Sequence, residues 1–155
     1  MTTLEGHTDR VYCLEYSNGR VYSGSEDGTI KVWNGRDGSL ITTLEAHEDV
    51  VRGLTIHDDK LHSISFDDTI KVWNCSTHAL IATLEGLWGG RDSLTFYDGK
   101  MYSGGVMDAN SFVVINVYSC SDYDLIATLT HDDEDNDDDD DEDEDEEEEE
   151  EEENK

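Results

Sequence analysis

One string of thirteen residues occurs in two closely similar copies, and this repeat constrains the fold more than any other feature of the sequence. YSGSEDGTIKVWN occupies residues 22–34 and returns 40 residues later as HSISFDDTIKVWN at residues 62–74. The tripeptide TLE begins at Thr3, Thr43 and Thr83, with the same spacing. A fixed period near 40 residues indicates a tandem array of supersecondary units that pack on their neighbours.

A third unit follows, and it carries an insertion. SGG at residues 103–105 lies 40 residues after SIS at residues 63–65, but INVYSCSDYDLIA at 115–127 lies 45 residues after IKVWNCSTHALIA at 70–82. The five extra residues therefore fall around residues 106–112. We expect an enlarged loop at this point of the third unit.

The pattern within each unit predicts short strands separated by tight turns. In the first unit, residues 11–16 (VYCLEY) alternate apolar with polar or smaller side chains. A two-residue type I′ turn requires positive φ twice, which Asn, Asp and Gly tolerate. The same place holds such a pair in every unit: Asn18-Gly19, Asp58-Asp59 and Asp98-Gly99. Further turns at residues 26–28 and 35–38 lead into the runs 29–33 and 40–44, so four antiparallel strands are predicted per unit.

These residues resemble the WD-repeat β-propeller family. Gly6-His7 is followed about 25 residues later by SGSEDGTIKVWN, which ends in Trp33-Asn34 where that family usually has Trp-Asp. The second unit ends in the same way at Trp73-Asn74. The resemblance covers roughly residues 3–129, and the phrase GHTDRVYCLEY looks most like the propellers of F-box proteins, RING-type ligases and atypical kinases. It implies an all-β fold, a partial β-propeller of three four-stranded antiparallel blades.

The resemblance also implies how the chain is divided. Residues 1–130 would form the partial propeller, with blades at about 8–44, 48–84 and 91–129, and residues 1–5 match the last strand of a preceding blade. Propellers use about four to eight blades, so three are not expected to close a ring. Two copies of the chain would supply six blades. Alternatively, the sequence is a fragment or a decaying relative of a larger propeller.

The family places a hydrogen-bonded set inside each blade. The set joins the histidine of Gly-His, a serine on the second strand, the aspartate of the next turn and the tryptophan of the third strand. Carried over to this sequence, the serine is Ser23 or Ser25 in the first unit and Ser63 or Ser65 in the second. We assign Ser25 and Ser65, which gives the sets His7, Ser25, Asp27 and Trp33, and His47, Ser65, Asp67 and Trp73.

Partner binding in this family generally uses the narrow face near the entry to the first strand of each blade. The equivalent positions there are Tyr12, Arg52 and Asp92, with Glu26, Phe66 and the insertion of residues 106–112 nearby. In related F-box propellers an arginine at the Arg52 position often helps to bind phosphorylated peptides. A solvated or salt-bridged arginine is the alternative interpretation, because a phosphate would meet one cation beside a carboxylate. Arg10, just before the strand, is a further surface candidate.

The third unit departs from the pattern of the other two. Leu87 and Tyr118 replace the histidine and tryptophan of the hydrogen-bonded set, which we expect to be absent or rearranged there. Trp88 has no counterpart in the repeat, and it is either an exposed partner anchor or packed at a blade edge. Asp108 lies in the enlarged loop, which suits an individual contact or neutral drift equally well.

The C-terminal end carries most of the charge. Of the 22 residues from 132 to 153, 21 are Asp or Glu, and the whole chain has a formal net charge of −30. Like charges at this density repel one another and bury no apolar area, so residues 131–155 are predicted to be a disordered acidic tail. Such a tail attracts basic proteins such as histones and repels nucleic acid, or it serves solubility alone.

The remaining composition argues against catalysis and membrane insertion. The three cysteines have no metal-ligand spacing, and their odd number argues against a disulfide framework, which favours a reducing cytoplasmic or nuclear location. No apolar run reaches the ~18 residues that span a bilayer. There is no nucleophile elbow, phosphate-binding loop or pair of carboxylates with perturbed pKa values. We expect no cofactor, no metal site and no enzymatic activity.

The sequence therefore predicts a non-catalytic protein–protein interaction scaffold or adaptor built on WD repeats. Two alternatives are an acidic chaperone of histones or other basic proteins and a substrate-receptor fragment of a ubiquitin ligase. The expected partners are other proteins, including a second copy of the chain and basic proteins bound through the tail. Nucleic acid and membranes are not expected.

Overall fold

The structure consists of strands and turns. The computed structural model describes residues 3–85, 93–106 and 113–130, so the predicted acidic tail lies outside the described residues. No helix occurs among them, which confirms the all-β prediction. The twelve strands are β1 (Val11–Ser17), β2 (Arg20–Ser25), β3 (Thr29–Asn34), β4 (Leu40–Glu45), β5 (Val51–His57), β6 (Lys60–Ser65), β7 (Thr69–Asn74), β8 (Leu80–Glu85), β9 (Leu94–Tyr97), β10 (Lys100–Val106), β11 (Val113–Ser119) and β12 (Leu125–Thr130).

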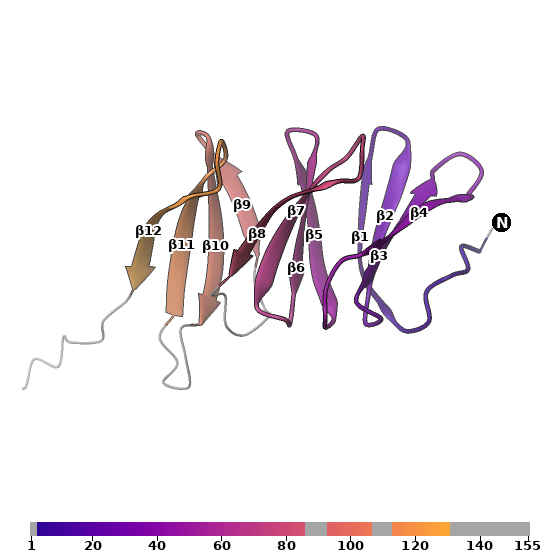
Figure 1. Ribbon diagram of the computed structural model, residues 1–155, viewed down its shortest axis with the longest axis horizontal. Coiled ribbons are helices and arrows are strands. Elements are labelled where there is room, and N and C mark those ends of the chain that lie inside the picture. The colour runs from indigo at the N-terminus through magenta and orange to yellow at the C-terminus, as the bar shows by residue number, and fades with distance from the viewer. Residues whose placement is uncertain (1–2, 86–92, 107–112, 131–155) are drawn as a thin grey trace, which may run out of the picture.

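The strands form three separate four-stranded antiparallel sheets, as the repeat predicts. The first sheet has the order β1-β2-β3-β4, the middle sheet β5-β6-β7-β8 and the third sheet β9-β10-β11-β12. Each sheet is a meander, so every connection within it is a hairpin. Figure 1 shows the sheets standing side by side in chain order, with the first at the right and the third at the left.

Residues 3–10 form no strand. The expectation that residues 1–5 match the last strand of a preceding blade therefore stays a prediction, since residues 1 and 2 lie outside the described residues.

The turn between the first two strands of each sheet has the predicted backbone. Asn18 and Gly19 have φ values of 50° and 76°, as a two-residue turn with both residues left-handed requires. The corresponding pairs, Asp58-Asp59 and Asp98-Gly99, also have positive φ at both residues. These turns fix the register of each hairpin, with Ser17 opposite Arg20 and His57 opposite Lys60.

The first two sheets share one apolar core. Strands β1 and β2 contact β5. The face of the first sheet that carries Ile30 and Val32 packs on the face of the middle sheet that carries Leu61 and Trp73. Full burial of such a side chain contributes about 1.5–3 kcal/mol. The core residues of this interface are Tyr22, Ile30, Val32, Leu44, Ala46, Val51, Leu54, Leu61, Trp73 and Cys75.

The opposite face of the middle sheet packs on the third sheet through a second apolar core. Residues Ile70 and Val72 occupy the positions of Ile30 and Val32, 40 residues on, and they are equally buried. The second core consists of Ile64, Ile70, Val72, Leu84, Met101, Tyr118 and Tyr123. The middle sheet is therefore covered on both faces, whereas the first and third sheets are each covered on one.

Candidate functional site

A buried hydrogen-bond network joins the segment before β1 to the first sheet. His7 Nε2 lies 2.7 Å from Ser23 Oγ, and His7 Nδ1 lies 2.9 Å from Asp27 Oδ2. Trp33 Nε1 donates to the same serine oxygen at 2.8 Å. The side chains of His7 and Asp27 are largely buried. The network therefore fixes the entry segment, the β2–β3 turn and strand β3 to one another.

The middle sheet contains the same network. His47 Nδ1 lies 2.8 Å from Asp67 Oδ2, and its Nε2 lies 2.8 Å from Ser63 Oγ. Trp73 Nε1 donates to Ser63 Oγ at 3.0 Å. The same hydrogen bonds join equivalent residues in both sheets, so the repeated sequence determines the arrangement of the network.

The serines of the two networks are Ser23 and Ser63, so our assignment of Ser25 and Ser65 is wrong. Trp33 lies opposite Val21 in the sheet, and Ser25 is four residues further along β2. At about 3.3 Å per residue, that is roughly 13 Å, which an indole does not reach. Ser25 instead accepts from the backbone N–H of Asp27 and donates to the carbonyl of Asp9.

Two threonines also belong to the networks, although the family resemblance did not point to them. Thr29 donates to Asp27 Oδ1 through its hydroxyl at 2.7 Å and through its backbone N–H at 2.9 Å. Thr69 makes the same two bonds to Asp67. The signal was present, because an Asp followed two residues later by Thr recurs in both units and is typical of an Asx turn.

The networks hold their aspartates ionised. Burial raises the pKa of Asp27, but the hydrogen bonds from Thr29, Thr8 and His7 outweigh burial and keep this pKa well below its ordinary value. The pKa of Asp67 is lowered in the same way. Burial also lowers the pKa of His47, although Asp67 opposes this effect. At pH 7 the middle network therefore pairs a neutral imidazole with a carboxylate.

Serine, histidine and aspartate are also the residues of the catalytic triad of serine hydrolases. Ser23 and Ser63 are buried, however, and each hydroxyl already accepts a hydrogen bond from a tryptophan. A nucleophile must be free to approach a substrate carbon. The arrangement is therefore suited to stabilising the sheets.

Replacing Ser63 by alanine is expected to lower the free energy of unfolding more than replacing Ser65. Ser63→Ala leaves both Trp73 Nε1 and His47 Nε2 without a partner, at a cost of about 2–3 kcal/mol. Ser65→Ala removes only local contacts with Asp67 and Asp49, which contribute about 1 kcal/mol. Urea unfolding of the two variants measures the difference, and equal losses would contradict this role of Ser63.

The third sheet lacks the network among its described residues. Tyr118 pairs with Met101 where Trp73 pairs with Leu61. Ser103, the counterpart of Ser63, is buried, and its hydroxyl has no hydrogen-bond partner among the described residues. Leu87 and Asp108 lie outside the described residues.

A second feature is an exposed group of side chains that we call the arginine cluster, formed by Arg10, Tyr12, Glu26, Arg52 and Phe66. The guanidinium carbon of Arg52 lies 4.9 Å from the centre of the Tyr12 ring and 5.3 Å from that of Phe66. Tyr12 Oη donates to Glu26 at 3.3 Å, and Arg10 lies 3.7 Å from Glu26. The cluster spans the first and middle sheets, because Tyr12 belongs to β1 and Arg52 to β5.

Two β-bulges position the cluster. The register of β1 on β2 shifts between Val11 and Cys13, and that of β5 on β6 shifts between Val51 and Gly53. The extra residue in each bulge is Tyr12 or Arg52, and a bulge re-aims the side chain at the end of a strand. Sequence alternation alone does not reveal a bulge, so the contact of Arg52 with two aromatic rings was not anticipated.

The structure brings together three of the predicted partner-binding residues. Arg10, Tyr12 and Arg52 all lie in the arginine cluster. The other three, Trp88, Asp92 and Asp108, lie outside the described residues. Among the described residues Arg52 has no ion pair with a carboxylate, so its charge is available to a partner.

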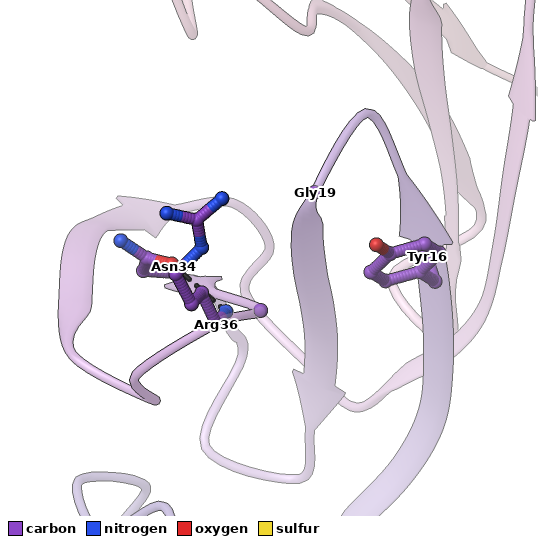
Figure 2. Close-up of a pocket in the computed structure, with 5 residues that line it drawn as sticks. Tyr16, Gly19, Asn34 and Arg36 are labelled. Atoms are coloured by element: carbon purple, nitrogen blue, oxygen red, sulfur yellow. Dashed lines mark hydrogen bonds between the residues drawn. The ribbon is translucent and has the colours of Figure 1, made fainter.

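A shallow pocket lies at the opposite end of the first sheet, beside the β1–β2 turn. It has a volume of about 380 Å³ and is lined by Tyr16, Gly19, Asn34, Gly35 and Arg36. Figure 2 shows Tyr16 on one side of the pocket and Arg36 with Asn34 on the other. Asn34 Oδ1 accepts the backbone N–H of Arg36 at 2.9 Å, which holds the β3–β4 turn. No sequence pattern predicted this pocket.

The described residues contain no group of three or more side chains that could hold a metal ion. Within the same part of the chain, no helix is long and apolar enough to cross a membrane.

Known proteins share the repeated sequence pattern and the meander sheets of this chain. The family model of the WD domain, G-beta repeat, matches residues 1–34 and 38–74. These two segments are WD40 repeats. A WD40 protein is typically a scaffold for protein interactions, and the family is typically non-catalytic.

Curated and solved WD40 proteins resemble the chain over different lengths. The F-box/WD repeat-containing protein 7 of Drosophila melanogaster is 46% identical over 39 residues, which are 24% of this chain and 3% of that protein. The chain thus spans a very small part of this relative.

Two solved structures match most of the WD40 array. The computationally designed Ika4 protein is 32% identical, with a TM-score of 0.70 over 84% of this chain and 77% of that chain. The WD40 β-propeller domain of Doa1 is 26% identical, with a TM-score of 0.64 over 83% of this chain and 43% of that chain. The propeller arrangement of the three sheets is therefore confirmed.

Proposed function

We propose that this WD40 array is a protein-interaction scaffold that binds an anionic peptide segment through the arginine cluster. The observation that supports the proposal is the position of Arg52, which is exposed and lies within cation–π distance of both Tyr12 and Phe66. Contact with two rings holds the guanidinium in place, so less side-chain entropy is lost when a partner binds. A carboxylate or a phosphate on the partner would accept two hydrogen bonds from the guanidinium.

The neighbouring groups favour one anion in an otherwise apolar segment. Glu26 is engaged by Tyr12 and Arg10, which lowers its repulsion toward an incoming anion. The exposed rings of Tyr12 and Phe66 offer apolar area to the residues that flank the anion. Aromatic and arginine side chains are enriched among residues that dominate interface energies.

A peptide-binding experiment tests this function. Peptides with a single carboxylate or phosphate beside apolar residues, and neutral peptides of the same length, would be titrated into the full chain. We expect Arg52→Ala to weaken binding of the anionic peptides about tenfold or more, because it removes the charged contact. Arg36→Ala is the matched control, since Arg36 is equally cationic and lies at the other end of the first sheet. Equal binding by the Arg52→Ala and Arg36→Ala proteins would refute the proposal.

The other functions predicted from the sequence, chaperoning of basic proteins and substrate reception for a ubiquitin ligase, stay predictions. A reducing cytoplasmic or nuclear setting remains part of the proposal, and it is supported by the free thiols of Cys13, Cys75 and Cys120.

A further inference from the structure

The two outer sheets each leave one face uncovered, and the repeat identifies what those faces would contact. On the first sheet Leu14 is 65% exposed, whereas Leu54, its counterpart in the middle sheet, is 8% exposed because the first sheet covers it. On the third sheet Leu129 is 54% exposed, whereas Leu44 and Leu84 at the same repeat position are each 8% exposed. The same side chains are thus buried inside the array and exposed at its ends.

Exposure at the outer edge of the sheets is different in kind. Leu40, Leu80 and Leu125 occupy one repeat position at the start of β4, β8 and β12, and they are exposed in all three sheets. Ile41, Ile81 and Ile126 behave in the same way. These residues are exposed irrespective of neighbouring sheets, so the loss of cover at Leu14 and Leu129 is specific to the two end faces.

The end faces are opposite halves of one interface. The uncovered face of the third sheet carries Tyr102, Ile115, Val117 and Leu129, the counterparts of the residues with which the first sheet packs on the middle sheet. Of these, Ile115 and Leu129 are exposed, Tyr102 is half-buried and Val117 is buried. The exposed face of the first sheet carries Leu14, Tyr16 and Val21, the counterparts of Leu54, Ile56 and Leu61 in the middle sheet. Apolar patches of this kind on both ends favour association.

The two internal interfaces share a polar contact, and the residue equivalent to its acceptor lies in the pocket of the first sheet. At the first interface Arg20 donates to the carbonyl of Cys75, and at the second Lys60 donates to the carbonyl of Cys120 at 3.3 Å. The counterpart of Cys75 and Cys120 in the first sheet is Gly35, which lines the pocket of Figure 2. The three residues are structurally equivalent, since each donates its backbone N–H to the carbonyl of a β-hairpin turn residue: Gly19, Asp59 and Gly99.

The counterpart of Arg20 and Lys60 is Lys100, at the start of β10 on the exposed face of the third sheet. The Lys100 side chain makes no hydrogen bond among the described residues, whereas its backbone pairs with Tyr97 and Ser119 within the sheet. By analogy with the internal interfaces, the carbonyl of Gly35 would accept a hydrogen bond from a basic side chain of a sheet packed on the first sheet. Lys100 of a second copy occupies the repeat position of Arg20 and Lys60 and would be that side chain.

We infer that the third sheet of one copy packs on the first sheet of a second copy, with Lys100 entering the pocket beside Gly35. Two copies joined in this way have two identical interfaces, because each copy offers both faces. Together they contain six sheets, which lies within the four to eight blades of closed propellers. The second copy thus covers both exposed end faces at once.

Sedimentation of the full chain at micromolar concentration and about 0.15 M ionic strength tests the inference. We expect a dimer. Leu14→Glu alters only the first-sheet face and Leu129→Glu only the third-sheet face, and each is expected to raise the dissociation constant about a hundredfold or more, because a carboxylate would be buried without a partner. Ile81→Glu on the outer edge of the middle sheet is the matched control and should leave the dimer intact.

Mixing the two end-face variants distinguishes the head-to-tail arrangement from other dimers. The Leu14→Glu protein retains a normal third-sheet face and the Leu129→Glu protein retains a normal first-sheet face, so a heterodimer with one intact interface should form at high concentration. A folded monomer of the unmodified chain would overturn the inference. A dimer that survives Leu14→Glu, or a mixture without heterodimer, would also overturn it.

Discussion

Replacing Asp67 by alanine is expected to lower the free energy of unfolding by about 3 kcal/mol, which is a large fraction of the ~5–15 kcal/mol of a typical domain. Asp67 accepts hydrogen bonds from the ring of His47, the hydroxyl and backbone N–H of Thr69 and the backbone N–H of Glu48. Alanine leaves these donors without their acceptor in a largely buried site. The midpoint of urea unfolding, followed by tryptophan fluorescence because Trp73 belongs to the network, measures the loss.

Asp37→Ala is the matched control for this experiment. Asp37 accepts hydrogen bonds from the hydroxyl and the backbone N–H of Ser39 and a longer one, at 3.4 Å, from Asn34 Nδ2, but it lies in an exposed turn and contacts no histidine. Its replacement should cost well under half as much as that of Asp67, since water satisfies the exposed groups. Equal destabilisation by Asp37→Ala and Asp67→Ala would show that the buried network contributes no more than an ordinary turn.

The second large effect is a loss of stability in mild acid that depends on His62. Burial lowers the pKa of His62 to about 4, and neither ring nitrogen has a hydrogen-bond partner among the described residues. The ring packs between Phe96 and Tyr123, with ring centres 4.8 Å and 6.0 Å away. The folded state therefore favours the neutral imidazole.

The direction of the pH effect follows from proton binding. In the unfolded chain a histidine has a pKa of about 6.5, so between pH ~6.5 and ~4 the unfolded state binds a proton that the folded state does not. The stabilising effect of the neutral ring is present above pH ~6.5, and about 3 kcal/mol is lost as the pH falls to ~4. Urea unfolding at a series of pH values measures this slope.

The repeat supplies the matched variant for the pH series. The first and third sheets have Tyr22 and Tyr102 at the position of His62, so His62→Tyr is expected to fit the site. The difference between the two proteins isolates His62, because the acidic tail and the networks of Asp27 and Asp67 are common to both. If the difference in unfolding free energy does not change between pH 7 and pH 4, the proposed titration is absent.

The period of the sequence was sufficient to predict the number of sheets, their strands and their hairpin turns. The turns are local, and Asn18-Gly19 or Asp58-Asp59 specifies a backbone conformation irrespective of the rest of the chain. The choice between Ser23 and Ser25 was not local. It depends on how far Trp33 extends along the neighbouring strand, and both serines alternate onto the same side of β2.

The arginine cluster depended still more on tertiary structure. The sequence placed Tyr12 and Arg52 at equivalent positions, but their contact arises from two bulges and from the packing of one sheet on the next. Phe66 has Glu26 at its repeat position, so repetition alone did not identify it as a partner of Arg52. The deviations from the repeat, rather than the repeat itself, give this face its chemistry.

The paired left-handed residues of the β1–β2 and β5–β6 turns have a consequence for how such a molecule can diversify. A two-residue connection of this kind admits no added residue without shifting the hairpin register, so that end of each sheet is fixed in length. The links from β2 to β3 and from β6 to β7 lie beside Arg52 and are free of this constraint, and the sequence of the third unit contains five additional residues around the corresponding link. Insertions that bind new partners can therefore be accommodated at the β2–β3 and β6–β7 end of the sheets, while the two-residue turns at the opposite end keep the hairpin registers unchanged.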